Sequence, residues 1–230
     1  METAKTKLWY IRNLEPFKHL SEEAHRMIEE NSVMRNVKKG QTLYLQGSAD
    51  KSVYLLKEGA VKITKLNRQG KEIILDIFGA GSVFGEMAHA ATGMRDEAAV
   101  VVEDGLVCTM DREFFEEAVR KMPELSMSVT KIIGLRRHRI ENKLLSLLYS
   151  TVEQRLARTL VELLEEFGKP HEGGRMIGIK LTHKDLAELI ASTRETVTAG
   201  LNRMKNEGLI EFDGKHVVVK SPDRLRALAL

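Results

Sequence analysis

Three polar side chains close to residue 194 have types and spacing that suit contacts with the edges of DNA bases. Arg194 can donate two hydrogen bonds to the O6 and N7 atoms of a guanine, and Glu195 can accept one from the N4 amino group of a cytosine. Thr198 follows one helical turn later and can reach a base or a phosphate. Such contacts require a helix that presents its first turn to the major groove.

The sequence around these residues predicts two short helices joined by a tight turn. Thr182 and Asp185 have the spacing of a capping box, and apolar residues follow on one face. Ala191 and Ser192 interrupt this pattern, and Ser192 with Glu195 predicts a second capping box, so that the next helix begins at Ser192. The two helices form a predicted helix-turn-helix. Its candidate DNA-binding residues are Thr182, Ser192, Thr193, Arg194, Glu195, Thr198 and Arg203.

A hairpin is predicted next, around Asp213 and Gly214, as in winged helices. Basic and acidic residues nearly balance between Lys180 and Lys220, so charge alone does not separate a DNA-binding unit from a small helical domain. The position of Arg194 in the first turn of the second helix favours DNA.

The first half of the chain changes from a helical to a β pattern. Apolar residues recur at three- and four-residue steps from Lys7 to about Asn36, which predicts helix, with Ser21 as a helix start. Frequent glycines between short β-type runs then predict a small sandwich or barrel. The expected strands are Val53–Leu56, Ala60–Leu66, Glu72–Phe78, Ala98–Val102 and Leu106–Met110.

Helices are expected again after Asp111. Phe114–Lys121 and Val152–Phe167 have helical patterns, and residues 168–174 are predicted to be a loop. Between them, Glu124–Tyr149 predicts one long helix with a stripe of apolar residues at coiled-coil-like spacing. The stripe consists of Val129, Ile133, Ile140, Leu144, Leu147 and Leu148. A dimer helix or an amphipathic helix packed on its own domain would both give this pattern, and the length favours a dimer.

The composition is that of an ordinary globular chain. Of 230 residues, 43% are apolar and 30% are charged, with a net charge of +3, so a packed core is expected. Cys108 is the single cysteine, which excludes an intramolecular disulfide and a four-cysteine iron–sulfur or zinc site. Because Met1–Leu14 has no long apolar stretch and no run approaches a membrane span, we expect a cytoplasmic protein with no membrane contact.

The order of a glycine-rich β-domain, a long helix and a winged helix resembles the Crp/Fnr family of transcription regulators. Tyr54–Gly59 and Gly81–Met87 are similar to the family's jelly-roll motifs, and Leu181–Ile210 is similar to its helix-turn-helix. The resemblance implies a homodimer that binds a palindromic promoter site on double-stranded DNA and recruits or blocks RNA polymerase.

The implied fold is α+β. It has an N-terminal β jelly-roll (double-stranded β-helix) sensor domain at residues 1–122, similar to a cyclic-nucleotide-binding domain. A dimerisation helix follows at residues 123–150, and a winged helix-turn-helix domain occupies residues 151–230.

The resemblance also locates an effector pocket, where the sequence departs from the family. In the family's cyclic-nucleotide binders a Gly-Glu pair binds the ribose, and a later Arg-Ser/Thr-Ala segment binds the phosphate. This chain has Gly85, Glu86 and Arg95, but Asp96 and Glu97 replace the Ser/Thr and the Ala. Two carboxylates there repel a phosphate, and one of them can pair with Arg95 instead. The candidate pocket residues are Gly85, Glu86, Met87, Arg95, Asp96, Glu97, Ile140 and Glu141.

The dimer helix carries a second mismatch. Ile140 and Glu141 fall where cAMP-binding relatives have a polar pair that meets the nucleotide base. We therefore expect a regulator that does not respond to cAMP, in which Arg136 or Arg137 could serve another anionic ligand. The alternative is a cyclic-nucleotide-dependent activator that uses Glu86 and Arg95.

Two positions of the helix-turn-helix also differ from the family. Ala191 stands where relatives commonly have glycine in the turn, and a positive φ there would cost alanine about 1 kcal/mol. Ala199 stands where the cAMP-responsive relatives have a second arginine, so we expect weaker or different base readout at that position.

Other cofactors and an enzymatic role fit the sequence poorly. The cysteine count excludes an iron–sulfur cluster, and the histidines show no paired spacing for zinc. Haem would need an axial ligand, for which the pocket-forming segment offers His89. A jelly-roll enzyme or ligand-binding module, a remote alternative, would need several histidines around a metal, whereas the β-region has His89 alone. We expect no enzyme activity, no haem and no metal.

Overall fold

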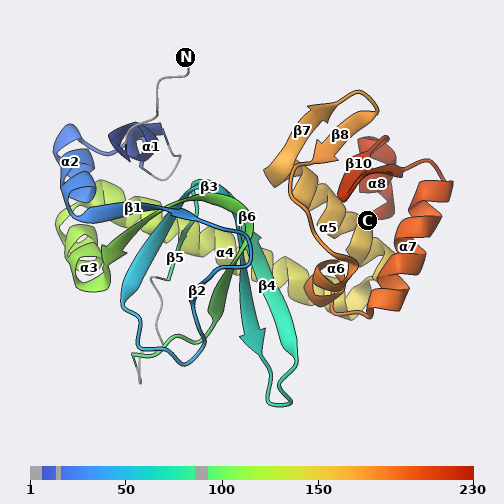
Figure 1. Ribbon diagram of the computed structural model, residues 1–230, viewed down its shortest axis with the longest axis horizontal. Helices are drawn as coiled ribbons and strands as arrows, with labels where there is room; N and C mark the ends of the chain where they lie inside the picture. Colours follow the sequence, from blue (N-terminus) through green and yellow to red (C-terminus); the bar gives the residue numbers. More distant parts are fainter. Residues whose placement is uncertain (1–6, 14–16, 86–92) are drawn as a thin grey trace. The chain divides into compact units, whose positions relative to one another are not determined.

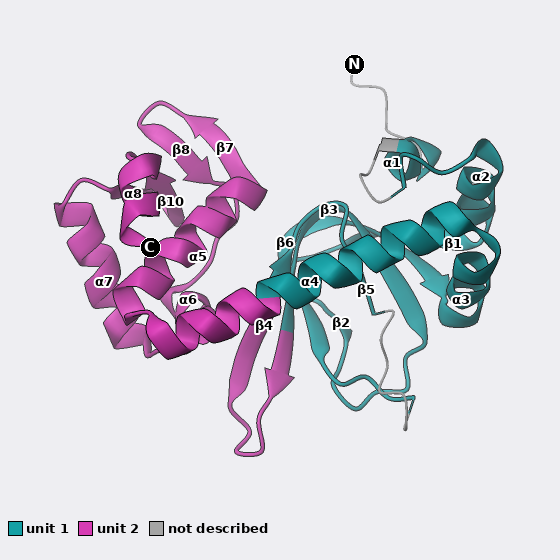
Figure 2. Ribbon diagram, turned by 180° about the vertical axis from the view of Figure 1, so that it is seen from behind, with its two compact units in different colours: residues 1–63, 77–139 teal, residues 64–76, 140–230 magenta. Residues whose placement is uncertain are grey.

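The computed structural model describes residues 7–13, 17–85 and 93–230, and most of its helices and strands are labelled in Figure 1. The chain divides into two compact units, which Figure 2 distinguishes by colour. Residues 1–63 and 77–139 belong to the first unit, and residues 64–76 and 140–230 belong to the second. The long helix α4 and the hairpin of β3 and β4 contribute residues to both.

Six strands form the sheet of the β-rich part. They are β1 (Ser32–Val37), β2 (Thr42–Tyr44), β3 (Ser52–Leu66), β4 (Glu72–Phe78), β5 (Val83–Phe84) and β6 (Ala98–Asp111). Their order is β1-β6-β3-β4, with β2 paired to β6 and β5 paired to β3. The expected β-domain is confirmed, but residues 32–36, which we predicted as helix, form strand β1 and pair antiparallel with β6.

The four runs predicted as separate strands on either side of Gly59 and Gly105 are two continuous strands, β3 and β6. Gly59 has a φ of +89°, and a Cβ there would lie 2.8 Å from the Asp104 carbonyl oxygen and the Gly105 Cα. The backbones of the two strands therefore approach too closely for a side chain. These glycines mark a close approach within the sheet and do not end the strands.

Apolar side chains of the described residues form clusters on both sides of the sheet strands and under the helices of the first unit. One lies among the strands and includes Tyr44, Tyr54 and Phe84, whose rings contact one another. Another lies where helices pack on the sheet, and includes Phe17 and Phe115. Burial of such side chains is the main stabilising contribution to a fold of this kind.

The short helices described in this unit are α1 (Lys7–Asn13), α2 (Glu22–Glu30) and α3 (Arg112–Lys121). The predicted start at Ser21 is confirmed, since its side chain accepts a hydrogen bond from the Ala24 N–H. Asp111 caps α3 in the same way, by accepting from the Glu113 N–H. The side chain of Tyr10 on α1 donates to Glu58, which ties this helix to β3.

The predicted long helix is present as α4 (Pro123–Tyr149). Val129 packs on the cluster that contains Phe17 and Phe115, but most of the predicted stripe is exposed in the single chain. The exposed large apolar side chains of α4 are Met127, Ile133, Leu135, Ile140, Leu144, Leu145, Leu147, Leu148 and Tyr149. Of the helices in the described ranges, none is both long and apolar enough to cross a membrane.

The second unit contains four further helices and a four-stranded sheet of order β7-β8-β10-β9. Its elements are α5 (Val152–Phe167), β7 (Gly168–His171), β8 (Gly174–Ile177), α6 (His183–Leu189), α7 (Arg194–Asn206), β9 (Ile210–Asp213), β10 (His216–Val219) and α8 (Pro222–Leu228). The prediction of a loop at 168–174 was wrong, because β7 and β8 pair as an antiparallel hairpin. The predicted hairpin around Asp213 and Gly214 is confirmed.

Candidate nucleic-acid interface and ligand pocket

Helix α6 begins as the sequence predicts. Thr182 accepts a hydrogen bond from the Asp185 N–H at 3.1 Å, and the Asp185 carboxylate accepts from the Thr182 N–H at 2.9 Å. This reciprocal pair is a complete capping box. The apolar face of α6 then buries Leu186, Ala187 and Leu189, which fixes the helix against the rest of the unit.

The turn between α6 and α7 depends on one strained residue. Ala191 has a φ of 52°, in the left-handed region that alanine seldom adopts. The Ser192 N–H donates to the Ala187 carbonyl at 2.9 Å, which closes the α6 end in the pattern of a Schellman motif. Ala191 therefore has the positive φ for which we gave the cost of an alanine above, and the turn brings α7 directly after α6 (Figure 1).

The start of α7 differs from the prediction by one residue. Thr193, not Ser192, is the N-cap, and its side chain accepts from the Thr196 N–H at 3.2 Å. Arg194 is thus the first helical residue and Glu195 the second, so Glu195 is not the partner in a capping box. Ser192 still belongs to the turn, because it follows the left-handed Ala191 and its N–H closes the end of α6. The cap of α7 is therefore the next residue.

The first turn of α7 presents its charged groups outward. Arg194 and Glu195 are exposed, and neither side chain has a hydrogen bond or ion pair with another described residue. On the opposite face Val197, Leu201 and Met204 are buried in the unit. The helix is therefore anchored by its apolar face while a guanidinium and a carboxylate at its start are available to a ligand.

The remaining candidates are engaged within the unit. Thr198 is half-buried, with its hydroxyl bonded to His183 and to the Arg194 carbonyl. Arg203 donates to Glu153 of α5 at 2.8 Å. His183 was not singled out by the sequence, because a histidine three residues before an apolar run has no distinctive spacing.

The β9–β10 hairpin follows α7 as a wing. Lys215 is exposed between its two strands, and Lys220 after β10 lies 3.4 Å from Glu211 on β9. Lys205 of α7 lies above the Phe212 ring, at 5.9 Å from its centroid. Basic side chains thus accompany the end of α7 and the wing, which suits contact with a phosphate backbone.

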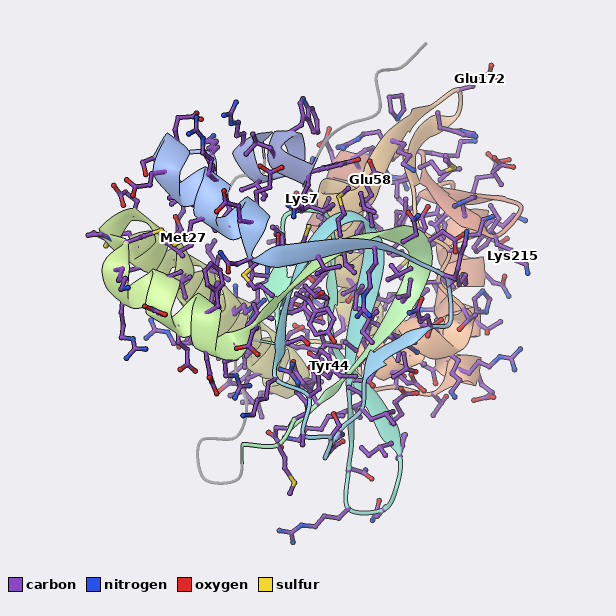
Figure 3. All side chains as sticks on the ribbon, turned by 60° about the vertical axis from the view of Figure 1, so that its left-hand side comes forward. Lys7, Met27, Tyr44, Glu58, Glu172 and Lys215 are labelled. Carbon is purple, nitrogen blue, oxygen red and sulfur yellow. The ribbon has the colours of Figure 1, made fainter. Side chains whose placement is uncertain are left out.

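In the β-rich unit, Arg95 is fully buried and its donors are directed at protein oxygens. Its guanidinium donates to the Gly85 and Ser52 carbonyls and to the carboxylate of Asp50. The side chain of Arg95 is 0% exposed and that of Asp50 is 28% exposed. The centroid of the Tyr44 ring lies 4.4 Å from the Arg95 Cζ atom, and Figure 3 shows Tyr44 among the strands.

The carboxylate beside Arg95 is therefore Asp50, and not Asp96 or Glu97 as we expected. Asp96 is exposed, and Glu97 accepts a hydrogen bond from the Tyr44 hydroxyl at 3.0 Å. Asp50 also accepts from the Ser52 N–H at 3.0 Å. No motif in the sequence marks Asp50, because it comes from another strand connection, 45 residues before Arg95.

The other pocket candidates are divided between described and undescribed segments. Gly85 has a φ of +77°, and a Cβ there would lie 2.9 Å from the Ser52 carbonyl oxygen. Glu86 and Met87, with His89, lie outside the described residues. Ile140 and Glu141 are exposed on α4. Among the described candidates, the arginine that the resemblance assigns to a phosphate is enclosed and paired with Asp50.

One of the two cations that we suggested for another anionic ligand, Arg136, is also engaged. Arg136 on α4 donates to the Val83 carbonyl, and its Cζ atom lies 4.6 Å from the centroid of the Phe78 ring. Such contacts hold α4 to the β-rich unit and leave Arg136 less available to a ligand.

Burial shifts the pKa values of two groups of this unit. Lys57 on β3 is 2% exposed, and its Nζ atom has no hydrogen-bond partner in the part of the chain that the structure describes. Burial lowers the pKa of Lys57 from 10.5 to about 8. Burial also raises the pKa of the Cys108 thiol. Neither group faces solvent, so neither suggests a reactive site.

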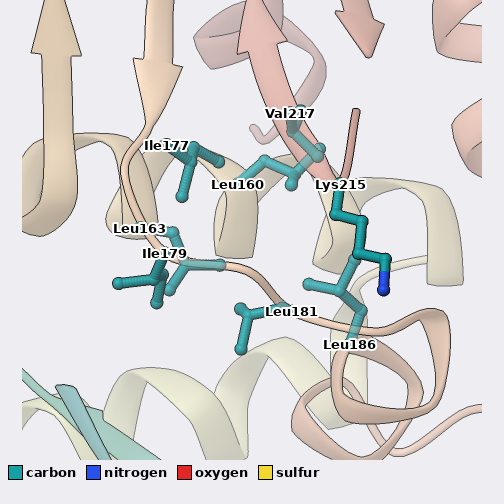
Figure 4. A pocket seen from close by; sticks show the side chains of 8 residues that line it. All are labelled: Leu160, Leu163, Ile177, Ile179, Leu181, Leu186, Lys215 and Val217. Atoms are coloured by element: carbon teal, nitrogen blue, oxygen red, sulfur yellow. The ribbon is translucent and has the colours of Figure 1, made fainter. Parts of the chain in front are cut away.

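A small hollow in the second unit is apolar. Figure 4 shows its lining, in which Lys215 supplies the charged group. The lining residues are Leu160, Leu163, Ile177, Ile179, Leu181, Leu186, Lys215 and Val217. Within residues 7–13, 17–85 and 93–230, no group of three or more His, Cys, Asp or Glu side chains could hold a metal ion.

Comparison with known proteins gives two matches to family models. The model described as the cyclic nucleotide-binding domain matches residues 34–122, and the model described as the Crp-like helix-turn-helix domain matches residues 154–228. The matched segments coincide with the β-rich region and with the unit that contains α6 and α7.

Curated proteins and solved structures agree with these matches. The chain is 32% identical to the global nitrogen regulator of Synechococcus elongatus over 187 residues, which is 80% of this chain and 84% of that protein. It is 29% identical to the CRP-like cAMP-activated global transcriptional regulator of Mycobacterium tuberculosis, over 81% of this chain and 84% of that protein. The structure of FixK2 from Bradyrhizobium japonicum has the same fold, with a TM-score of 0.74 and 23% identity, over 86% of this chain and 98% of that chain.

Proposed function

Because the chain belongs to the Crp/Fnr family of DNA-binding transcription regulators, we propose that it is a homodimer that reads a palindromic promoter site with α7. Each α7 enters a major groove, so that two half-sites about 34–36 Å apart are contacted together. In each half-site Arg194 binds a guanine, and Glu195 accepts from a neighbouring cytosine. RNA polymerase is the partner that the bound dimer recruits or blocks.

The observation that carries this proposal is the contrast between the two faces of α7. Val197, Leu201 and Met204 anchor one face, while Arg194 and Glu195 have no partner among the described side chains. An unpaired, exposed guanidinium in the first turn of the second helix matches the position from which such motifs contact base edges.

The dimer is supported by the exposed apolar residues of α4. Ile140 is 68% exposed, Leu144 is 56% exposed and Leu148 is 65% exposed in the single chain. Isolated exposed apolar residues are common, but a row along one helix is typical of a surface that another helix covers. A symmetric pairing of two α4 helices would bury this row in both copies.

We further propose that DNA binding does not require cAMP. The support is the pairing of Arg95 with Asp50, which engages the charge that a cyclic phosphate would need. The cyclic-nucleotide-dependent alternative requires Arg95 to leave Asp50 and two backbone carbonyls. A ligand would have to compensate for these lost hydrogen bonds.

Selection from a random duplex library tests the reading by α7. The purified protein should enrich a palindromic sequence whose half-site centres are about one helical turn apart. Glu195→Ala should relax the preference at one cytosine and leave other positions unchanged. Equal enrichment of all sequences would contradict the proposal.

The oligomeric state is tested at the α4 surface. Ile140→Asp places a charge in the proposed seam, so sedimentation at micromolar concentration should show a monomer. Glu141→Asp, a conservative change at the next residue, is the matched control and should remain dimeric. A dimer in both variants would place the interface elsewhere.

Titration with cAMP tests the effector proposal. A ligand that binds only the folded state, at about 100 times its dissociation constant, stabilises that state by about 2.7 kcal/mol. We expect no shift in Tm and no change in promoter affinity at millimolar cAMP. Saturable binding that tightens DNA affinity tenfold would restore the alternative with Glu86 and Arg95.

A further inference from the structure

The Thr198 hydroxyl has two partners inside the helix-turn-helix. Its Oγ1 atom lies 2.8 Å from the Arg194 carbonyl oxygen, one turn earlier in α7. It also lies 2.8 Å from the Nδ1 atom of His183, the first residue of α6. One side chain of the proposed reading helix is therefore held by a side chain from the preceding helix.

The direction of these two hydrogen bonds follows from the chemistry of the groups. A carbonyl oxygen can only accept, so the single proton of the Thr198 hydroxyl lies toward Arg194. The Thr198 oxygen must then accept from His183, which places a proton on Nδ1. The two partners together occupy the hydroxyl proton of Thr198 and one lone pair of its oxygen.

His183 is itself held in place. The ring is half-buried, and its centroid lies 6.4 Å from that of the Phe212 ring on β9. It therefore sits against both α7 and the wing, so its Nδ1 atom has little freedom to move away from Thr198.

We propose that His183 is a positioning residue that makes Thr198 read DNA with its methyl group. This inference rests on the proposed readout by α7. A threonine in a helix divides between two rotamers, and the His183 bond favours the one that turns the hydroxyl toward α6. The methyl group is then what Thr198 offers to a base, and the matching feature in the major groove is the 5-methyl group of a thymine.

Replacement of thymine by deoxyuridine tests the contact, because it removes only that methyl group. Each thymine of the selected half-site is replaced in turn, and affinity is measured for the full-length protein. A buried methyl contact corresponds to about a fourfold loss of affinity. We expect this loss at one thymine in the wild-type protein.

Four variants assign the contact to its residues. Thr198→Ser removes the methyl and should abolish the discrimination between thymine and deoxyuridine, whereas Thr198→Val retains a methyl and should preserve it. His183→Ala releases the hydroxyl and should reduce the discrimination. His183→Asn retains an N–H donor near the Nδ1 position and should preserve it, and Tm measurements on all four report their folding.

Three outcomes overturn the inference. They are a wild-type protein that tolerates deoxyuridine at every position, a Thr198→Ser variant that still discriminates, and a His183→Ala variant with undiminished discrimination. If the wild-type protein does not prefer any site over random DNA, the proposed function fails as well. If it prefers a site but does not discriminate, only the role of His183 fails.

Discussion

Two arginines at the two candidate sites are in opposite situations. Arg194 at the start of α7 is exposed and has no side-chain partner among the residues that the structure describes. Arg95 in the β-rich unit is enclosed and donates to Gly85, Ser52 and Asp50. The family resemblance leads us to expect that each of them binds a charged or polar ligand, yet only Arg194 has its charge available to one.

A family motif thus indicates where a residue lies in the sequence, but it does not indicate whether the side chain is free to bind a ligand. The availability depends on the residues that surround it in the fold. Asp50 supplies the negative charge for Arg95 from within the protein, which is why we propose that an external phosphate is not needed there. Among the described residues no carboxylate pairs with Arg194, so a ligand can supply the partner.

The largest effect is expected from breaking the buried pair. Asp50→Ala leaves the enclosed Arg95 without its carboxylate, which should lower the free energy of unfolding by about 3 kcal/mol, because one partner is partly exposed. Phosphate or cAMP should then raise the Tm of this variant more than that of the wild type. Chemical denaturation and a thermal-shift titration measure the two effects.

Asp96→Ala is the matched control for this experiment. Asp96 is next to Arg95 in the sequence but is exposed, so its removal should change stability by less than about 0.5 kcal/mol. Equal losses in the two variants would mean that Asp50 is not the specific counter-charge of Arg95.

Lys57 is buried like Arg95, but its Nζ atom has no acceptor in the described part of the chain. Lys57→Met should therefore raise the free energy of unfolding at pH 7, by on the order of 2 kcal/mol. The folded-state pKa is about 8 and the unfolded value 10.5, so the unfolded chain binds more protons between these values. Wild-type stability should accordingly gain a contribution from this group as pH rises from about 8 to 10.5, and the variant should lack it.

Lys71→Met is the control, since Lys71 is exposed in the turn between β3 and β4. It should leave both the stability at pH 7 and its pH dependence unchanged. An identical pH profile for the wild type and Lys57→Met would show that Lys57 keeps its proton in the folded state.

Arg194→Ala removes the exposed arginine of the two. Loss of a bidentate contact should reduce affinity for the selected site by about 1–3 kcal/mol and relax the preference for one G·C pair. Arg203→Ala, on the same helix but paired with Glu153, should alter affinity less and leave base preference intact. If Arg194→Ala weakens binding to specific and random DNA equally, the residue contacts a phosphate.

The sequence predicted the helix-turn-helix well because its signals are local. Thr182 and Asp185 form a capping box within one turn, and the apolar spacing of α7 fixes which face is buried. The error of one residue at Ser192 arose because both Ser192 and Thr193 are good caps, and the choice depends on the turn geometry at Ala191.

The partner of Arg95 could not be predicted in the same way. Asp50 and Arg95 meet only because the β-sheet brings distant segments together, and no spacing rule connects them. The prediction that glycines end the strands was wrong for a related reason. Gly59 allows its strand to approach Asp104 on another strand closely, and the strand continues through it. Local patterns thus defined the exposed site, while the enclosed one depended on tertiary contacts.

The smallest effect concerns the turn that presents Arg194. Ala191 adopts a φ of 52°, so Ala191→Gly should relieve strain and raise the free energy of unfolding by about 0.5–1 kcal/mol. For a chain of this size that corresponds to a rise in Tm of about 2–4 °C at most. Ala199→Gly makes the same substitution in the middle of α7, where helical φ gives glycine no advantage, and should lower stability by about 1 kcal/mol. Opposite signs for the two variants would confirm that the turn is strained, and a loss of stability in both would mean that Ala191 is accommodated without cost.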